Sequence, residues 1–230
     1  MKYQYLERAT FLERKNRFVA ELNKDGQQIF AHVPNTGRCK ELLVPGVTAL
    51  VYKAENPQRK YPYTLWAVYK GERLVHIDSA GANQLTAEAL AKGVIGELRG
   101  AEQIQREKTF GTSRFDFRFE LNGQTCFMEV KGVTLETDGI ARFPDAPTER
   151  GARHLRELTE AKKQGYGAYV LFVVQMQGVT EFRPHWERDR AFAEALINAC
   201  KNGVTVLCYD TVVTPEEIAL ANPVAINLEE

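Results

Sequence analysis

The sequence predicts an α/β (α+β) protein in which a small closed β-barrel precedes a mixed β-sheet flanked by helices. Between residues 11 and 77, short apolar segments alternate with turn residues and show almost no helical periodicity, which is typical of a small barrel. Residues 113–131 alternate polar and apolar side chains around a tight turn, as a β-hairpin does. After residue 148, amphipathic segments alternate with apolar runs, which indicates helices on a sheet. We expect a barrel domain at residues 1–80 and an α/β domain at residues 81–230.

The first domain should contain five strands, at residues 18–22, 28–33, 47–52, 61–69 and 74–77. Residues 24–26 form the turn between the first two strands, and residues 34–37 form a loop. Aromatic side chains should mostly fill the barrel, with one or two left exposed to stack on nucleic-acid bases: Phe30, Tyr52, Tyr61, Tyr63, Trp66 and Tyr69.

The register of the hairpin follows from its turn. Asn122-Gly123 is a strong signal for a two-residue turn, which pairs Leu121 with Gln124 and places Asp116 opposite Glu129. One face of the hairpin is then apolar and predicts a core, with Phe115, Phe117, Phe119 and Leu121 opposite Cys126, Met128 and Val130. The other face carries Asp116, Glu129 and Lys131, with Arg114 and Arg118 beside them.

Two opposed carboxylates repel each other, by about 1 kcal/mol in water and about 4 kcal/mol at an effective dielectric constant near 20. A divalent cation relieves this repulsion, and Mg²⁺ (or Mn²⁺) between Asp116 and Glu129 is the natural candidate. Lys131 can contact a metal-bound water or the charge that develops on a phosphate. An Asp followed by Glu-x-Lys on the next strand is the pattern of the PD-(D/E)xK nuclease core. The alternative is a solvated face on which Arg114, Arg118 and Lys131 neutralise the carboxylates.

The remaining elements surround this hairpin. A short helix is expected at residues 83–92, and residues 104–108 are either a helix end or a strand. Glu107 in that segment is either a further metal ligand or an exposed surface residue. A helix should run from Thr148 to about Lys163, followed by a strand at 169–174, a helix at 189–201 with Phe192, Leu196 and Cys200 inward, and a strand at 204–209.

The helix that begins at Thr148 should bury Ala152, Leu155 and Leu158, and its polar side should carry Arg150, Arg153, His154, Arg156, Lys162 and Lys163. Basic residues in a first turn oppose the helix dipole, so a bound phosphate would relieve the strain. The alternative is a solvated face balanced by Glu157 and Glu160. His154 is either a phosphate contact or a helix-packing residue. Asp145, after Pro144, follows the Glu-x-Lys and so cannot be the Asp of the nuclease motif.

Charge is unevenly distributed along the chain although the net charge is zero. Residues 1–75 carry 13 Lys and Arg against 7 Asp and Glu, whereas residues 76–230 carry 17 against 23. The barrel is thus the expected phosphate-binding part, with a solubilising surface as the equal alternative. No apolar run is long enough for a membrane span, no secretory signal is seen, and four cysteines without CxxC spacing indicate buried thiols in a reducing cytoplasm.

The sequence resembles the sugar fermentation stimulation protein (SfsA) family over nearly its whole length. Cys39 and the segment 78–83 depart from the family pattern. The resemblance rests on five separated blocks, at residues 31–37, 59–61, 113–116, 129–131 and 143–158. It implies an OB-like barrel joined to a PD-(D/E)xK nuclease-like domain, in a bacterial or archaeal DNA-binding protein linked to regulation of sugar (maltose) metabolism.

Three functions stay open on this basis. The first is a Mg²⁺-dependent DNA endonuclease that uses Asp116, Glu129 and Lys131. The second is a DNA-binding regulator that does not cleave, and the third is a module that binds no nucleic acid. The DNA contacts expected are Arg38, Lys40, Arg59, Lys60, Arg114, Arg150, Arg153 and His154. A homodimer is compatible with the sequence, which leaves the oligomeric state open.

Overall fold

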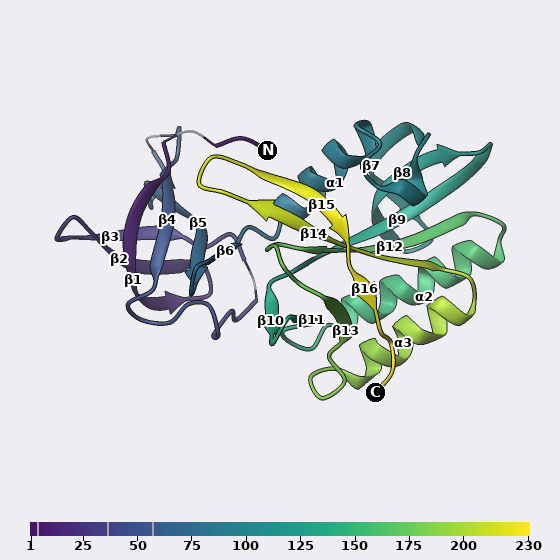
Figure 1. Cartoon of the computed structure of the whole chain (residues 1–230). Coiled ribbons are helices and arrows are strands. Elements are labelled where there is room, and N and C mark those ends of the chain that lie inside the picture. The colour runs from purple at the N-terminus through teal and green to yellow at the C-terminus, as the bar shows by residue number, and fades with distance from the viewer. Residues whose placement is uncertain (4, 36, 57) are drawn as a thin grey trace.

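The computed structural model describes residues 1–3, 5–35, 37–56 and 58–230, so Thr36 of the expected loop lies outside the described residues. The chain forms a barrel and a larger layered unit that lie side by side (Figure 1). Among the described residues, no helix has the length and apolar character that crossing a bilayer requires.

The barrel is a closed ring of five strands, four of which were expected. Its sheet runs in the order β3-β2-β1-β4-β5, and pairing of β3 with β5 closes the ring. These strands are β1 (Glu7–Asn16), β2 (Val19–Lys24), β3 (Gln27–His32), β4 (Thr48–Lys53) and β5 (Tyr63–Lys70). The expected strand at residues 74–77 is β6 (Arg73–His76), which pairs with β5 outside the ring. Strand β1 was not expected, because it is mostly polar and buries only Ala9 and Phe11.

The second unit is built on a mixed six-stranded sheet in the order β15-β14-β12-β9-β8-β7. Its strands are β7 (Glu102–Phe110), β8 (Ser113–Leu121), β9 (Gln124–Val133), β12 (Gly167–Val174), β14 (Thr205–Val213) and β15 (Ile218–Pro223). The expected hairpin is β8–β9, with Leu121 opposite Gln124 and Phe117 opposite Met128. Asn122 and Gly123 have the positive φ angles, 52° and 76°, that this turn requires. Residues 104–108 belong to strand β7 and not to a helix.

Helices cover both faces of this sheet. Helix α1 (Gly81–Ala91) lies on one face and α2 (Glu149–Lys163) with α3 (Arg190–Lys201) on the other. Strand β12 shows the division, because Leu171 belongs to the apolar cluster with α1 whereas Val170 and Phe172 belong to the cluster with α2 and α3. Side chains of Thr148 and Asp189 cap α2 and α3 at their first turns. A short 3₁₀ helix, η1 (Gly96–Leu98), follows α1.

Four short strands form a second sheet that the sequence analysis did not predict. They are β10 (Leu135–Thr137), β11 (Ile140–Phe143), β13 (Glu181–Pro184) and β16 (Ala225–Ile226), in the order β10-β11-β13-β16. Each is two to four residues long, too short for a recognisable period-2 pattern.

Two core assignments need correction. Phe115 does not join Phe117 and Phe119, because it belongs to the apolar cluster on the α2 side, where its ring contacts Phe127. Cys200 is exposed, and Ala199 is buried in its place. Phe192, Leu196 and Cys200 are spaced four residues apart, whereas an α-helix has 3.6 residues per turn. The third residue of such a series therefore lies away from the face of the first, which explains the error at Cys200. The other three cysteines are buried as expected, and all four are free.

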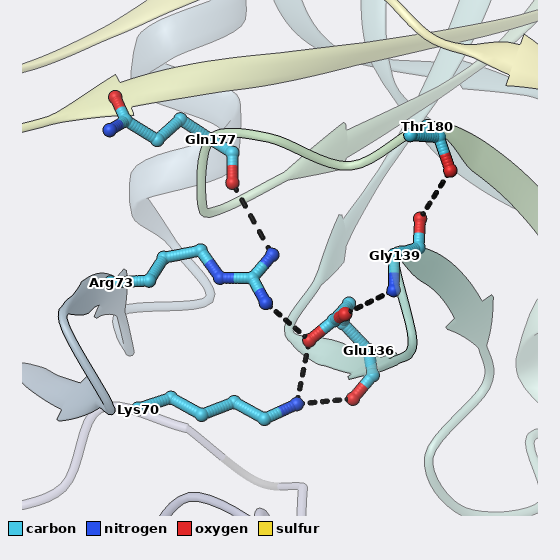
Figure 2. Close-up of polar contacts among 6 residues, drawn as sticks. All are labelled: Lys70, Arg73, Glu136, Gly139, Gln177 and Thr180. Atoms are coloured by element: carbon cyan, nitrogen blue, oxygen red, sulfur yellow. Dashed lines mark hydrogen bonds and ion pairs between the residues drawn. The ribbon is translucent and has the colours of Figure 1, made fainter.

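A buried carboxylate joins the two units (Figure 2). Glu136 on β10 is 2 % exposed, and its Oε2 accepts hydrogen bonds from Lys70 Nζ (2.6 Å) and Arg73 Nη2 (2.9 Å) of the barrel. Its Oε1 accepts the backbone N–H of Gly139 (2.6 Å). Burial acts to raise the pKa of Glu136, but the hydrogen bonds from Lys70 and Gly139 and the charge of Arg73 outweigh it and lower this pKa. We call Lys70, Arg73 and Glu136 the interdomain clasp.

Candidate metal centre and nucleic-acid cleft

The candidate catalytic carboxylates come from the neighbouring strands β8 and β9. Cross-strand pairing is regular up to Phe117 and Met128, and Asp116 is the next residue of β8. Its Oδ2 accepts the backbone N–H of Val130 (2.8 Å), and its Oδ1 accepts Nδ2 of Asn83 on α1 (2.7 Å). Burial raises the pKa of Asp116, and the nearby charge of Glu129 raises it further.

Glu129 is held more tightly than Asp116. It is 4 % exposed, and its Oε1 accepts a hydrogen bond from Lys131 Nζ (2.6 Å) and lies 2.5 Å from His154 Nδ1. Burial would raise the pKa of Glu129, but the contact with His154 and the charge of Lys131 lower it overall. Its second oxygen, Oε2, is buried and accepts no hydrogen bond within the described part of the chain. A buried carboxylate oxygen without a donor is costly unless a cation satisfies it.

His154 lies on the opposite side of α2 from the one predicted. It is 2 % exposed and packs edge-on against the Phe115 ring, with 6.2 Å between ring centres. A side chain this buried cannot contact a DNA phosphate, so that assignment is wrong and the helix-packing interpretation holds. The signal was present in the sequence, because His154 lies three residues after Gly151 and four before Leu158, both buried on the same helix face.

The residues present fit a divalent cation. Asp116 and Glu129 supply oxygen ligands, and Mg²⁺ is typically held by one or two carboxylates with water completing its shell. Among the residues that the structure describes, no three His, Cys, Asp or Glu side chains form a metal-binding group, so Glu107 does not join them. Glu107 is exposed and pairs with Arg114 at 3.4 Å, which favours its interpretation as a surface residue.

Lys131, whose ammonium contacts Glu129, also lines a cleft between the two units. The cleft has a volume of about 400 Å³ and is lined by Arg17, Asn35 and Gly37 of the barrel and by Lys131, Arg142, Asp145 and Thr148 of the second unit. The charged residues of this lining are three basic ones, Arg17, Lys131 and Arg142, and one acidic one, Asp145. Asp145 Oδ2 already accepts the backbone N–H of Arg38 (2.9 Å), so the cleft favours an anion.

The predicted DNA contacts occupy several places on the surface. Arg38 and Lys40 line a groove next to the cleft, together with Arg14 and Arg17. Arg59 donates to Thr64 Oγ1 (3.1 Å), and the exposed Lys60 lies over the Tyr61 ring. The other three are exposed residues outside the cleft lining: Arg114, Arg150 and Arg153. Arg38 and Lys40 in the groove were thus expected, whereas Arg17 and Arg142, which line the cleft itself, were not.

Arg14 organises the loop beside the cleft. Its guanidinium donates to four backbone carbonyls, those of Arg17 (2.6 Å), Asn35 (2.7 Å), Gly37 (2.6 Å) and Arg38 (2.7 Å). No local pattern signals this role, because three of the four carbonyls lie 21 to 24 residues from Arg14 in the sequence.

Both halves of the chain match known family models. Residues 12–77 match the SfsA N-terminal OB domain, and residues 80–217 match the sugar fermentation stimulation protein RE domain. The chain is 51 % identical over 221 residues to a sugar fermentation stimulation protein homolog of Clostridium acetobutylicum, with 96 % of each chain covered. It is 48 % identical to a homolog of Alkaliphilus oremlandii over 99 % of each chain.

A solved structure shares the whole fold. The structure of Pyrococcus furiosus SfsA in complex with Ca²⁺ superposes with a TM-score of 0.91 at 28 % sequence identity, covering 99 % of this chain and 98 % of that one. The barrel is thus an OB domain and the second unit has a nuclease-like fold, as the sequence predicted. The domain boundary at residues 80 and 81 stays a prediction.

Proposed function

Since the chain belongs to the sugar fermentation stimulation protein family, we propose that it is a DNA-binding protein whose nuclease-like domain cleaves DNA by metal-dependent hydrolysis. One observation carries this proposal: the donor-free buried oxygen of Glu129 lies beside a second carboxylate, Asp116, while Lys131 leads from them into a basic cleft. The Ca²⁺ in the related Pyrococcus furiosus structure supports a divalent cation here. The four free cysteines fit a reducing cytoplasm.

Each residue of the centre has a role that its contacts define. When bound, Mg²⁺ or Mn²⁺ would lower the pKa of a water and polarise the phosphate. Asp116 is fixed for cation binding by Val130 and Asn83, and His154 holds the Glu129 carboxylate from the α2 side. Lys131 lies between Glu129 and the cleft, where its ammonium can stabilise charge on the phosphate in the transition state.

A DNA-binding regulator of sugar (maltose) metabolism genes that does not cleave is the second candidate. One observation favours it: the described residues place no third acidic ligand with Asp116 and Glu129. An occupied cation site with two protein carboxylates still allows catalysis, and a protein that only binds DNA would not need Asp116, Glu129 and Lys131 together.

Plasmid nicking and gel-shift assays with and without Mg²⁺ or Mn²⁺ distinguish these functions. We expect metal-dependent cleavage that Lys131→Ala reduces by about 10²–10³-fold, with a much smaller loss of DNA affinity because the basic residues of the barrel remain. Lys163→Ala removes an exposed lysine of α2 and serves as the matched control. Binding without cleavage under any metal would support the regulator, and the absence of both would leave a module that binds no nucleic acid.

A further inference from the structure

The cleft that leads to Lys131 is small compared with double-stranded DNA. Its volume of about 400 Å³ is that of a small-ligand pocket. A B-form duplex contains a major groove about 12 Å wide and a minor groove about 6 Å wide, and the whole duplex is wider than either groove. A duplex is therefore too large to enter a cleft of this volume. Glu129 is almost fully buried, whereas Lys131, whose side chain is 14 % exposed, lines this cleft, so the cleft gives a phosphate access to Lys131.

The walls of the cleft are fixed to each other. Besides the interdomain clasp, hydrogen bonds from backbone N–H groups join the barrel to the second unit. The backbone N–H of Arg38 donates to Asp145 Oδ2 (2.9 Å), and the backbone N–H of His76 donates to the carbonyl of Gln175 (2.9 Å). Arg73 of the clasp also reaches the carbonyl of Gln177 (3.4 Å), as Figure 2 shows. Opening the cleft would break a buried ion pair whose acceptor, Glu136, has little access to water.

A stacking platform lies at the barrel side of the cleft. Phe18 is 49 % exposed, and the guanidinium of Arg17, which lines the cleft, lies 5.7 Å from the centre of its ring. These two residues connect β1 and β2, and OB domains bind oligonucleotides through this loop. Exposed aromatic rings in such domains stack on unpaired bases, whereas bases inside a duplex are already stacked.

We propose that the substrate enters the cleft as a single, unpaired strand, with a base on Phe18 and the adjoining backbone between Arg17, Arg142 and Lys131. This inference rests on the proposed function and specifies its substrate class. Duplex DNA is then a substrate only where it frays, carries a flap or is otherwise unpaired.

Fluorescence anisotropy tests the proposal on the full chain, with Ca²⁺ replacing Mg²⁺. The probes are labelled 20-mers that are single-stranded, fully paired, or paired with a single-stranded flap. We expect the single strand and the flapped duplex to bind at least about tenfold more tightly than the closed duplex. Phe18→Ala should weaken single-strand binding by about tenfold, and Phe18→Trp should retain it. Tyr5→Ala is the matched control, because Tyr5 is an exposed aromatic residue in a groove with Pro215 outside the cleft lining.

The possible failures are distinguishable. Equal or tighter binding of the closed duplex would overturn the single-strand proposal and leave the proposed DNA-binding function intact. A Phe18→Ala variant that binds like Tyr5→Ala would overturn the strand path over Phe18. If none of the three probes binds, the proposed function itself fails, and the inference fails with it.

Discussion

The interdomain clasp should stabilise the native arrangement far more than a surface ion pair does. Glu136→Gln keeps one oxygen acceptor but removes the charge, so two charge-assisted hydrogen bonds, from Lys70 and Arg73, are lost or weakened. Bonds to charged groups contribute about 1.5–3 kcal/mol each. Lys70 and Arg73 are 30 % and 27 % exposed and regain water when released, which offsets part of that loss. We expect the free energy of unfolding to fall by about 2–3 kcal/mol.

Removing one cation should cost less than removing the carboxylate. In Lys70→Met, Arg73 still donates to Oε2 and Gly139 still donates to Oε1, so the expected loss is about 1 kcal/mol. In the Glu136→Gln background the same Lys70→Met change should cost less, because the partner charge is already absent and only the bond from Lys70 to the backbone carbonyl of residue 136 (2.5 Å) remains.

Urea unfolding followed by tryptophan fluorescence measures these losses. Trp66 is a suitable probe because it is buried in the barrel strand β5, with its ring 5.3 Å from that of His76. Arg190→Met provides the matched control, since it removes a pair of ionic contacts to Glu194 and Glu230 that are largely exposed. If Glu136→Gln destabilises the protein no more than Arg190→Met does, or if the clasp variants are additive, the clasp reasoning is refuted.

Three further predictions follow from the charges. The lowered pKa of Glu136 means that its stabilisation is complete above the ordinary pKa of a glutamate, about 4.3, and is lost as the pH falls through the folded-state pKa. The stability gap between wild type and Glu136→Gln in urea titrations should therefore close as the pH is lowered below that value. Because ionised Asp116 is unfavourable at neutral pH, Asp116→Asn should stabilise the metal-free protein by about 1 kcal/mol. The same change should abolish the rise in melting temperature that millimolar Mg²⁺ causes in the wild type, and an unchanged wild-type melting temperature would count against the site. Neutralising Arg38 or Lys40 should weaken binding similarly for all DNA sequences and lower the salt slope by about one unit, and no change in slope would exclude a phosphate contact.

The parts of the fold that the sequence predicted correctly depend on local rules. The positive φ angles at Asn122 and Gly123 define the turn, and the turn alone sets the register that aligns β8 with β9. Thr148 and Asp189 are N-cap residues, and residues of these types can be recognised in the sequence, so both long helices begin where expected.

The parts that were missed depend on contacts between distant residues. Glu136 gains its partners from 63 and 66 residues away, and in the sequence it is an ordinary acidic residue before a turn. Phe115 changes sides of the sheet because the rings of Phe110 and Phe127 pack against it there. His154 lies on the helix face that periodicity marks as buried, but its partner Glu129 comes from β9 and could not be read from the helix. Periodicity identifies the face of an element but not the polar partner that another element will supply.

Strand β9 connects the candidate centre to the interdomain clasp. It carries Glu129 and Lys131, and the chain continues within a few residues to Glu136 on β10. The carboxylate that fixes the barrel is therefore attached almost directly to the lysine that faces the cleft. A shift of the barrel would move Arg17 and Phe18 relative to Lys131, and small misplacements near a reacting group have large effects on rate. The clasp is thus best understood as the element that sets the distance between the proposed strand-binding surface of the barrel and the candidate metal centre.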